Sequence, residues 1–170
     1  KCVHVAGTNG KGSTIAFLES LLRANGCKVG RYTSPHLHDV RERIVTNGQM
    51  IPEAVWVQAF ERVQEKCADL QPSYFETLTL MAFAHFRDYP VDVLLLETGM
   101  GGRWDATNAV SETGLSILTN VDRDHVELLG PHLSDIAWDK AGIAKKKGIL
   151  FTAEKRPALL KIIRAEAKKM

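Results

Sequence analysis

Several features of secreted, membrane-spanning and nucleic-acid-binding proteins are missing from this sequence. The cysteines, Cys2, Cys27 and Cys67, are odd in number, far apart and without a CxxC pair. This favours free thiols in a reducing compartment over a disulfide framework. No apolar run approaches the roughly 20 residues that span a bilayer, and no signal peptide opens the chain. We therefore expect a cytoplasmic protein without a membrane partner.

Strong charge of either sign is also missing. The 22 basic and 20 acidic residues leave a net charge of +2, and no basic run is interleaved with aromatic residues, so we expect no nucleic-acid partner. The lysines at 145–147 are interpreted as a solvated face. The chain has 170 residues, 45% of them hydrophobic, which is enough for one domain with a buried core. We expect this domain to be a monomer.

Short apolar runs alternate with longer helical patterns along the chain. This predicts an α/β fold with a mostly parallel sheet flanked by helices. The run 91–96 (VDVLLL) hardly alternates, so it predicts a strand buried on both faces. The predicted strands are 1–6, 28–33, 91–96, 115–120 and 148–152, with a short one at 43–46. The predicted helices are 13–25, 52–70, 76–87, 133–144 and 157–169, and long loops are predicted at 34–48 and 99–108. The first helix should bury Ile15, Leu18, Leu21 and Leu22 and end at Gly26.

The clearest motif, residues 7–13 (GTNGKGS), lies between the first predicted strand and helix. Glycines let backbone N–H groups approach phosphate oxygens, the helix N-terminus adds a positive dipole, and Lys11 adds a charge. The run departs from GxxxxGK[ST], and an ordinary strand-to-helix turn is the alternative. Three glycines and a lysine favour phosphate binding. The expected nucleotide contacts are Gly7, Thr8, Asn9, Gly10, Lys11, Gly12 and Ser13.

Two further strand ends carry polar side chains. Glu97 follows the run VDVLLL, and Asp124 with His125 follows the next predicted strand. Ligands bind outside the carboxyl ends of strands in open α/β sheets, and a carboxylate there can hold Mg²⁺ beside phosphates. Taken alone, Glu97 could equally be a cap or an ion-pair partner, and His125 could be structural. Their joint placement beside the phosphate loop favours a catalytic role.

Lys140 shares an apolar helical stripe with residues such as Leu133 and Ala137. A lysine buried there should be paired, neutralised or modified, because burial lowers its pKa and a neutral amine can react with CO₂ to form a metal-binding carbamate. Periodicity alone favours the alternative, in which the side chain extends to the surface. The remaining histidines offer less: His36 and His38 lack a third zinc ligand, and His4 and His85 are interpreted as packing residues.

In order and spacing, several segments resemble folylpolyglutamate synthase and dihydrofolate synthase, members of the Mur ligase superfamily. They are 4–13 (HVAGTNGKGS), 33–37 (TSPHL), 42–44 (ERI), 74–76 (YFE), 97–108 (ETGMGGRWDATN), 124–125 (DH) and 140–143 (KAGI). The resemblance covers essentially the whole chain. It implies that residues 1–170 form a P-loop-like Mur ligase central domain that binds ATP, and that a C-terminal glutamate-binding domain lies outside them.

The resemblance also implies roles for individual residues. Lys11, Glu97, His125 and Lys140 would be catalytic. Of two expected Mg²⁺ ions, one would be held by Ser34 and Glu97, and the other by His125 and a carbamylated Lys140. The implied substrate contacts are Ser73, Tyr74, Phe75, Glu76, Trp104, Asp105 and Ala106. Asp105 suits that role because a carboxylate can accept paired N–H bonds from an aminopterin edge.

The implied reaction is ATP-dependent addition of L-glutamate to dihydropteroate or a folyl(poly)glutamate through an acyl phosphate. It relies on positioning and charge neutralisation, and the isolated chain is expected to be inactive. One alternative is a Mur-type ligase acting on a cell-wall nucleotide peptide, from which Phe75 and the loop of Asp105 would distinguish it. Another is a non-catalytic nucleotide-binding module, which would lack a pterin site.

Overall fold

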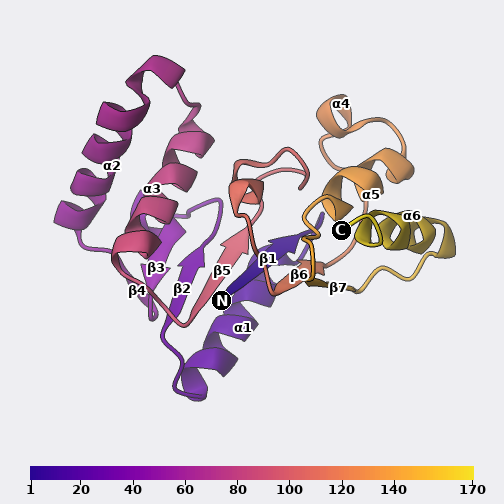
Figure 1. Ribbon diagram of the computed structural model, residues 1–170, viewed down its shortest axis with the longest axis horizontal. Coiled ribbons are helices and arrows are strands. Elements are labelled where there is room, and N and C mark those ends of the chain that lie inside the picture. The colour runs from indigo at the N-terminus through magenta and orange to yellow at the C-terminus, as the bar shows by residue number, and fades with distance from the viewer.

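The computed structural model describes residues 1–170 as one sheet with helices on both faces (Figure 1). The strands are β1 (Cys2–Ala6), β2 (Val29–Tyr32), β3 (Ile44–Thr46), β4 (Gln49–Met50), β5 (Val93–Glu97), β6 (Leu115–Leu118) and β7 (Ile149–Thr152). They are arranged in the order β4-β3-β2-β5-β1-β6-β7. All neighbours pair in parallel except β2–β3 and β3–β4. The predicted, mostly parallel α/β sheet is therefore confirmed.

One face of the sheet is covered by two groups of helices, and the other face is covered by a single helix. They are α1 (Lys11–Ala24), α2 (Glu53–Cys67), α3 (Tyr74–Asp88), α4 (Val126–Leu129), α5 (Leu133–Ala141) and α6 (Pro157–Ala167), with 3₁₀ segments η1 (Val40–Arg43), η2 (Ala68–Leu70) and η3 (Ala106–Ala109). In Figure 1, α2 and α3 lie at one end of the sheet, and α4, α5 and α6 lie at the other. None of these helices has both the length and the apolar character needed to cross a bilayer.

Neighbouring residues of the central strands face opposite helical layers. In β5, Leu95 packs with Ile15 of α1, whereas Leu96 packs against residues of α3. Both leucines are 0% exposed, which confirms that this strand is buried on both faces. At the far end, Leu118 of β6 packs with Ile136 of α5.

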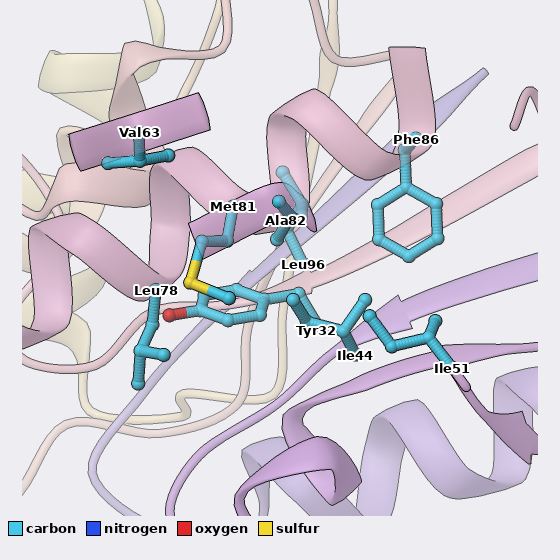
Figure 2. Packing of buried hydrophobic residues seen from close by; sticks show 10 residues of the cluster. Tyr32, Ile44, Ile51, Val63, Leu78, Met81, Ala82, Phe86 and Leu96 are labelled. Atoms are coloured by element: carbon cyan, nitrogen blue, oxygen red, sulfur yellow. The ribbon is translucent and has the colours of Figure 1, made fainter. Parts of the chain in front are cut away.

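The largest core cluster joins α2 and α3 to β2, β3 and β5. Figure 2 shows the Tyr32 ring close to Met81 and Leu78 of α3, with Ile44 of β3 nearby. The Tyr32 hydroxyl is buried, but it lies 3.1 Å from the Thr79 hydroxyl and is therefore hydrogen-bonded. This cluster fixes the start of α3, which forms one wall of the cleft described below.

The predicted elements are present with shifted ends, and one predicted burial is wrong. Leu21 is 62% exposed. Helical rotation of about 100° per residue carries it away from the stripe formed by Ile15, Leu18 and Leu22. Glu19 lies in that stripe instead, 2.9 Å from Arg31. The predicted helix 13–25 begins earlier, at Lys11, and β4 and α4 were not predicted because such short segments carry no periodic signal.

The buried and exposed leucines give a direct test of the core. Leu96→Ala should lower the free energy of unfolding by about 2–5 kcal/mol, because it removes a fully buried side chain. The control Leu21→Ala should change it by less than about 0.5 kcal/mol. Urea denaturation of both variants measures the difference, and equal losses would contradict this assignment of the core.

Candidate functional site

The carboxyl ends of three neighbouring strands bring the predicted functional segments together. In the sheet register, Val5 of β1 pairs with Glu97 of β5, and Ala6 pairs with Leu118 of β6. Parallel strands end at the same edge, so the predicted phosphate loop (residues 7–13) after β1, the carboxylate that ends β5 and the segment after β6 all emerge there. The predicted convergence of these three strand ends is confirmed.

The loop between β1 and α1 leaves the amino end of the helix open to solvent. Gly10, the N-cap residue, adopts a left-handed conformation with φ of 80°, and no side chain caps the helix. Asn9, Gly12 and Ser13 are exposed, and Lys11 is half-buried. The Lys11 ammonium donates a hydrogen bond to the Gly7 carbonyl at 3.1 Å. Uncapped amides at the positive end of a 14-residue helix suit an anion such as phosphate.

Residues following β6 hold this loop in place. The Asn9 amide donates to the Asn120 side-chain oxygen at 2.9 Å, and the Thr119 hydroxyl donates to the Asn9 carbonyl at 2.6 Å. The Thr8 hydroxyl accepts from the Asp122 amide at 2.9 Å. Gly7 lies so close that a Cβ there would be 1.8 Å from Thr119 Oγ1. No local sequence pattern indicates that Thr119 and Asn120 hold this loop in place.

Glu97 is a buried carboxylate without a basic partner. It is 4% exposed, and its Oε2 accepts a hydrogen bond from the Ser34 amide at 3.2 Å. A Cβ on Gly12 would be 3.7 Å from Oε2, so the carboxylate lies beside the phosphate loop. Burial raises the pKa of Glu97, while the Ser34 amide and the charge of Lys11 lower it in part. A buried, unpaired carboxylate fits a hard divalent cation, which prefers oxygen ligands.

Lys140 is buried rather than extended to the surface. It is 1% exposed, so the alternative that periodicity favoured is wrong. Burial lowers the pKa of Lys140, as does the charge of Lys11, while Asp124 and Asp139 partly offset the effect. His125 is exposed, and its Nε2 lies 3.4 Å from Asp124 Oδ1. No three His, Cys, Asp or Glu side chains of the chain are placed together as a metal site.

Beside this edge lies a cleft of about 600 Å³. Its walls come from the loop after β2, the start of α3, the loop 99–106, α4 and α5. The lining residues are Ser34, Pro35, Arg43, Ser73, Phe75, Glu76, Gly99, Met100, Trp104, Asp105, Ala106, Leu128, Leu129 and Asp139. All the predicted substrate-contacting residues except Tyr74 are in this set. Arg43, Leu128 and Asp139 were missed, because no local pattern shows that they face a shared cleft.

The carboxylate of Asp105 orders its own loop. Oδ2 accepts hydrogen bonds from the amides of Gly99 and Met100, both at 2.9 Å. Oδ1 accepts from the Thr107 amide at 2.9 Å and from the Thr107 hydroxyl. A carboxylate offers about four acceptor sites, and all of them are used here. Asp105 lines the cleft, but its predicted contact with an aminopterin edge stays a prediction.

His4 connects this loop to the sheet. Its Nε2 lies 2.8 Å from the Thr107 hydroxyl. That hydroxyl gives its one hydrogen to Asp105, so His4 must donate through Nε2. Burial lowers the pKa of His4 to about 3, so the ring is neutral. His4 is fully buried as predicted, and it also supports the cleft wall.

The loop 99–108 also forms contacts with α5 and α6 on its other side. The Gly102 amide donates to Asp139 Oδ1 at 2.8 Å. The Arg103 guanidinium lies 4.0 Å from the centre of the Trp138 ring and donates to Glu166 at 2.6 Å. The loop 99–108 is therefore held from both sides, with Trp104 at its tip 82% exposed.

The sequence model of the Mur ligase middle domain matches residues 5–169. This chain belongs to that family. Among curated relatives, it is 40% identical over 176 residues to the dihydrofolate synthase/folylpolyglutamate synthase of Bacillus subtilis, covering 99% of this chain and 41% of the relative. It is 39% identical to the human mitochondrial folylpolyglutamate synthase, covering 99% and 30%.

Solved structures of family members have the same fold. E. coli FolC in complex with DHPP and ADP matches with a TM-score of 0.93 and 39% identity, over 99% of this chain and 40% of FolC. A complex described as FPGS-AMPPCP-folate matches with a TM-score of 0.91 and 38% identity, over 99% and 43%. The chain thus spans less than half the length of these relatives.

The buried carboxylate predicts a pH-dependent gain in stability for Glu97→Gln. Because the pKa of folded Glu97 is raised above its ordinary value of 4.5, the wild-type chain loses stability as the pH rises through that raised value. Without divalent ions at neutral pH, the variant should be more stable by roughly 0.5–2 kcal/mol. The gain should vanish as the pH falls to the ordinary value.

Thermal unfolding between pH 4 and pH 8 measures this gain. The exposed Glu61→Gln, on α2, is the matched control and should have little effect. A gain for Glu97→Gln that is independent of pH would rule out desolvation of the carboxylate as its cause.

Proposed function

We propose that this chain is the ATP-binding part of a ligase that joins L-glutamate to a pterin-linked carboxylate, either dihydropteroate or a folyl(poly)glutamate. One observation carries the proposal: the phosphate loop and the aromatic-lined cleft meet at Ser34. Ser34 lines the cleft, and its amide binds the Glu97 carboxylate beside the phosphate loop. A phosphate donor and a carboxylate acceptor could therefore be bound next to each other.

In this proposal, the loop Gly7–Ser13 binds the phosphates of ATP through the open amides of α1 and through Lys11. Glu97, with Ser34, would hold Mg²⁺, which would neutralise charge on the phosphates. A second ion would be held by His125 and Lys140, the latter as a carbamate. The burial and lowered pKa of Lys140 support a neutral amine that can react with CO₂. A relative described with Mn, AMPPNP and L-glutamate bound agrees with a nucleotide and a divalent metal.

The chemistry then needs positioning more than a protein nucleophile. The substrate carboxylate attacks the γ-phosphorus of ATP, ADP leaves, and an acyl phosphate forms. The neutral amine of glutamate attacks the acyl carbon, the C–N bond forms, phosphate leaves, and the nitrogen loses one proton to water or to the departing phosphate. Lys11 would offset negative charge as the phosphoryl group is transferred. The hydrogen bonds of Thr119 and Asn120 to Asn9 would hold the loop 7–13 in position.

The cleft supports a folate-type substrate over a cell-wall nucleotide peptide. Phe75 lines it, and Trp104 stands 82% exposed at its rim, so a planar ring could stack there. A non-catalytic nucleotide module would have no use for such a wall. We further propose that glutamate is bound by a part of the protein outside these residues, and that the protein is a cytoplasmic monomer. Its three free cysteines agree with a reducing compartment.

Dihydropteroate binding tests the role of the cleft. Trp104→Ala should weaken binding roughly 3- to 10-fold through lost stacking and leave the melting temperature unchanged, since the side chain is exposed. Phe17→Ala is the matched control, because Phe17 is 73% exposed on α1, outside the cleft. Calorimetric titration measures both variants. Binding of Mg-ATP without binding of dihydropteroate would favour the nucleotide module.

Turnover by the isolated chain is a second test. Glutamate-dependent ADP release by residues 1–170 should fall far below the ~1–10³ s⁻¹ of ordinary enzymes, while Mg-ATP still binds. Lys11→Ala should weaken that binding. Turnover at an ordinary enzymatic rate would mean that these residues already contain the glutamate site.

A further inference from the structure

Arg43, the last residue of η1, is a buried arginine that lacks an acidic partner. It is 8% exposed and lines the cleft of about 600 Å³. It takes part in none of the ion pairs of the chain. A charge removed from water is costly unless it is paired. The burial of this unpaired guanidinium therefore favours an anion bound beside it.

The neighbours of Arg43 orient it without neutralising it. Its Nε donates to Nδ1 of His36 at 2.9 Å, which requires a lone pair on that nitrogen. The guanidinium carbon lies 5.7 Å from the centre of the Tyr74 ring. These contacts occupy Nε and one face of the guanidinium. The Tyr32 hydroxyl also lies within reach of the guanidinium. The two Nη groups, which can bind a carboxylate in bidentate fashion, form no ion pair with an acidic side chain of the chain.

The carboxylates that line the same cleft are already bound elsewhere. Glu76 accepts from the Ser73 amide at 2.8 Å in the cap of α3. Asp105 is saturated by its own loop, and Asp139 accepts from the Gly102 amide at 2.8 Å. Each is held by backbone N–H groups, and none pairs with Arg43. The carboxylates of the cleft therefore leave the charge of Arg43 uncompensated, which favours an anionic ligand.

The rest of the lining indicates what carries that anion. Phe75, Trp104, Met100 and Leu128 give the cleft an aromatic and apolar wall, which favours a flat, apolar group. The Thr33 amide donates to the Arg43 carbonyl at 3.1 Å, and the next residue, Ser34, donates to Glu97. Arg43 therefore lies at the end of the cleft near the loop 7–13. This combination fits a planar aromatic ring that bears a carboxylate.

We propose that Arg43, oriented by His36, binds the carboxylate of an aromatic carboxylic acid in this cleft and selects for that charged group. The inference rests on the proposed function only for the identity of the ligand, which would be a pteroate-type acid. In that setting, Arg43 holds the acceptor carboxylate near the phosphate loop and offsets its repulsion from Glu97 and the ATP phosphates.

A pair of probes of nearly the same shape tests the selection for charge. The chain is titrated with 4-aminobenzoate and with 4-aminobenzamide while the Arg43 Nε–H signal is followed by ¹⁵N NMR. The carboxylate should bind at least roughly tenfold more tightly than the amide, as expected for hydrogen bonds to a charged group, and should shift the Nε–H signal. Arg43→Gln should remove the difference between the probes, and Arg43→Lys should keep part of it.

Arg41→Gln is the matched control. Arg41 belongs to the same segment but pairs with Asp39 outside the cleft, so this variant should bind both probes as the wild type does. The proposal is overturned if the two probes bind equally, if neither binds, or if Arg43→Gln retains the preference for the carboxylate. The first two outcomes are measured on the wild type, so they decide the proposal even if Arg43→Gln does not fold.

A competition experiment separates this inference from the proposed function. If 4-aminobenzoate binds through Arg43 but dihydropteroate does not displace it, the folate function fails and the role of Arg43 stands. If dihydropteroate binds the wild type and Arg43→Gln equally well, the role of Arg43 fails and the folate function stands.

Discussion

The parallel pairing of β1 with β5 on one side and β6 on the other is the constraint on which the rest of the structure depends. It brings three strand ends to one edge, where Gly7 leaves β1, Glu97 ends β5 and Thr119 follows β6. The contact between Gly7 and Thr119 is so close that only glycine fits. The same strand carries His4, whose bond to Thr107 supports the neighbouring cleft. One strand thus positions both halves of the site.

Buried charges without partners concentrate at this edge. Glu97, Arg43 and Lys140 are 4%, 8% and 1% exposed, and none forms an ion pair within the chain. Elsewhere buried charges are matched, as Glu19 is with Arg31 and Glu166 with Arg103. The contrast separates charges that stabilise the fold from charges whose burial destabilises the free chain. Bound cations and anions would remove that cost.

Local patterns explain most of the fold and only part of the site. The apolar run of β5 predicted a strand buried on both faces. The glycines of residues 7–13 predicted the open loop between β1 and α1, whose binding of phosphate stays a prediction. Periodicity placed Lys140 on the apolar face of its helix but did not predict how deeply the side chain is buried. The pattern shows which way a side chain points, and not how far neighbouring elements cover it. Arg43 escaped notice because its cleft is assembled from segments far apart in the chain. The saturation of Asp105 likewise arises only once its loop has folded back on itself.

The loop 99–108 is held in place by contacts on two sides. Asp105 and Thr107 tie it to the sheet through His4, and Asp139 and Arg103 tie it to the helices on the other side. Its backbone entropy is therefore lost when the chain folds, so a ligand that contacts this wall has little ordering left to impose. The backbone that carries Trp104 is therefore already ordered in the free chain. When a ligand contacts the exposed Trp104 ring, the conformational entropy that is lost is mainly that of this one side chain.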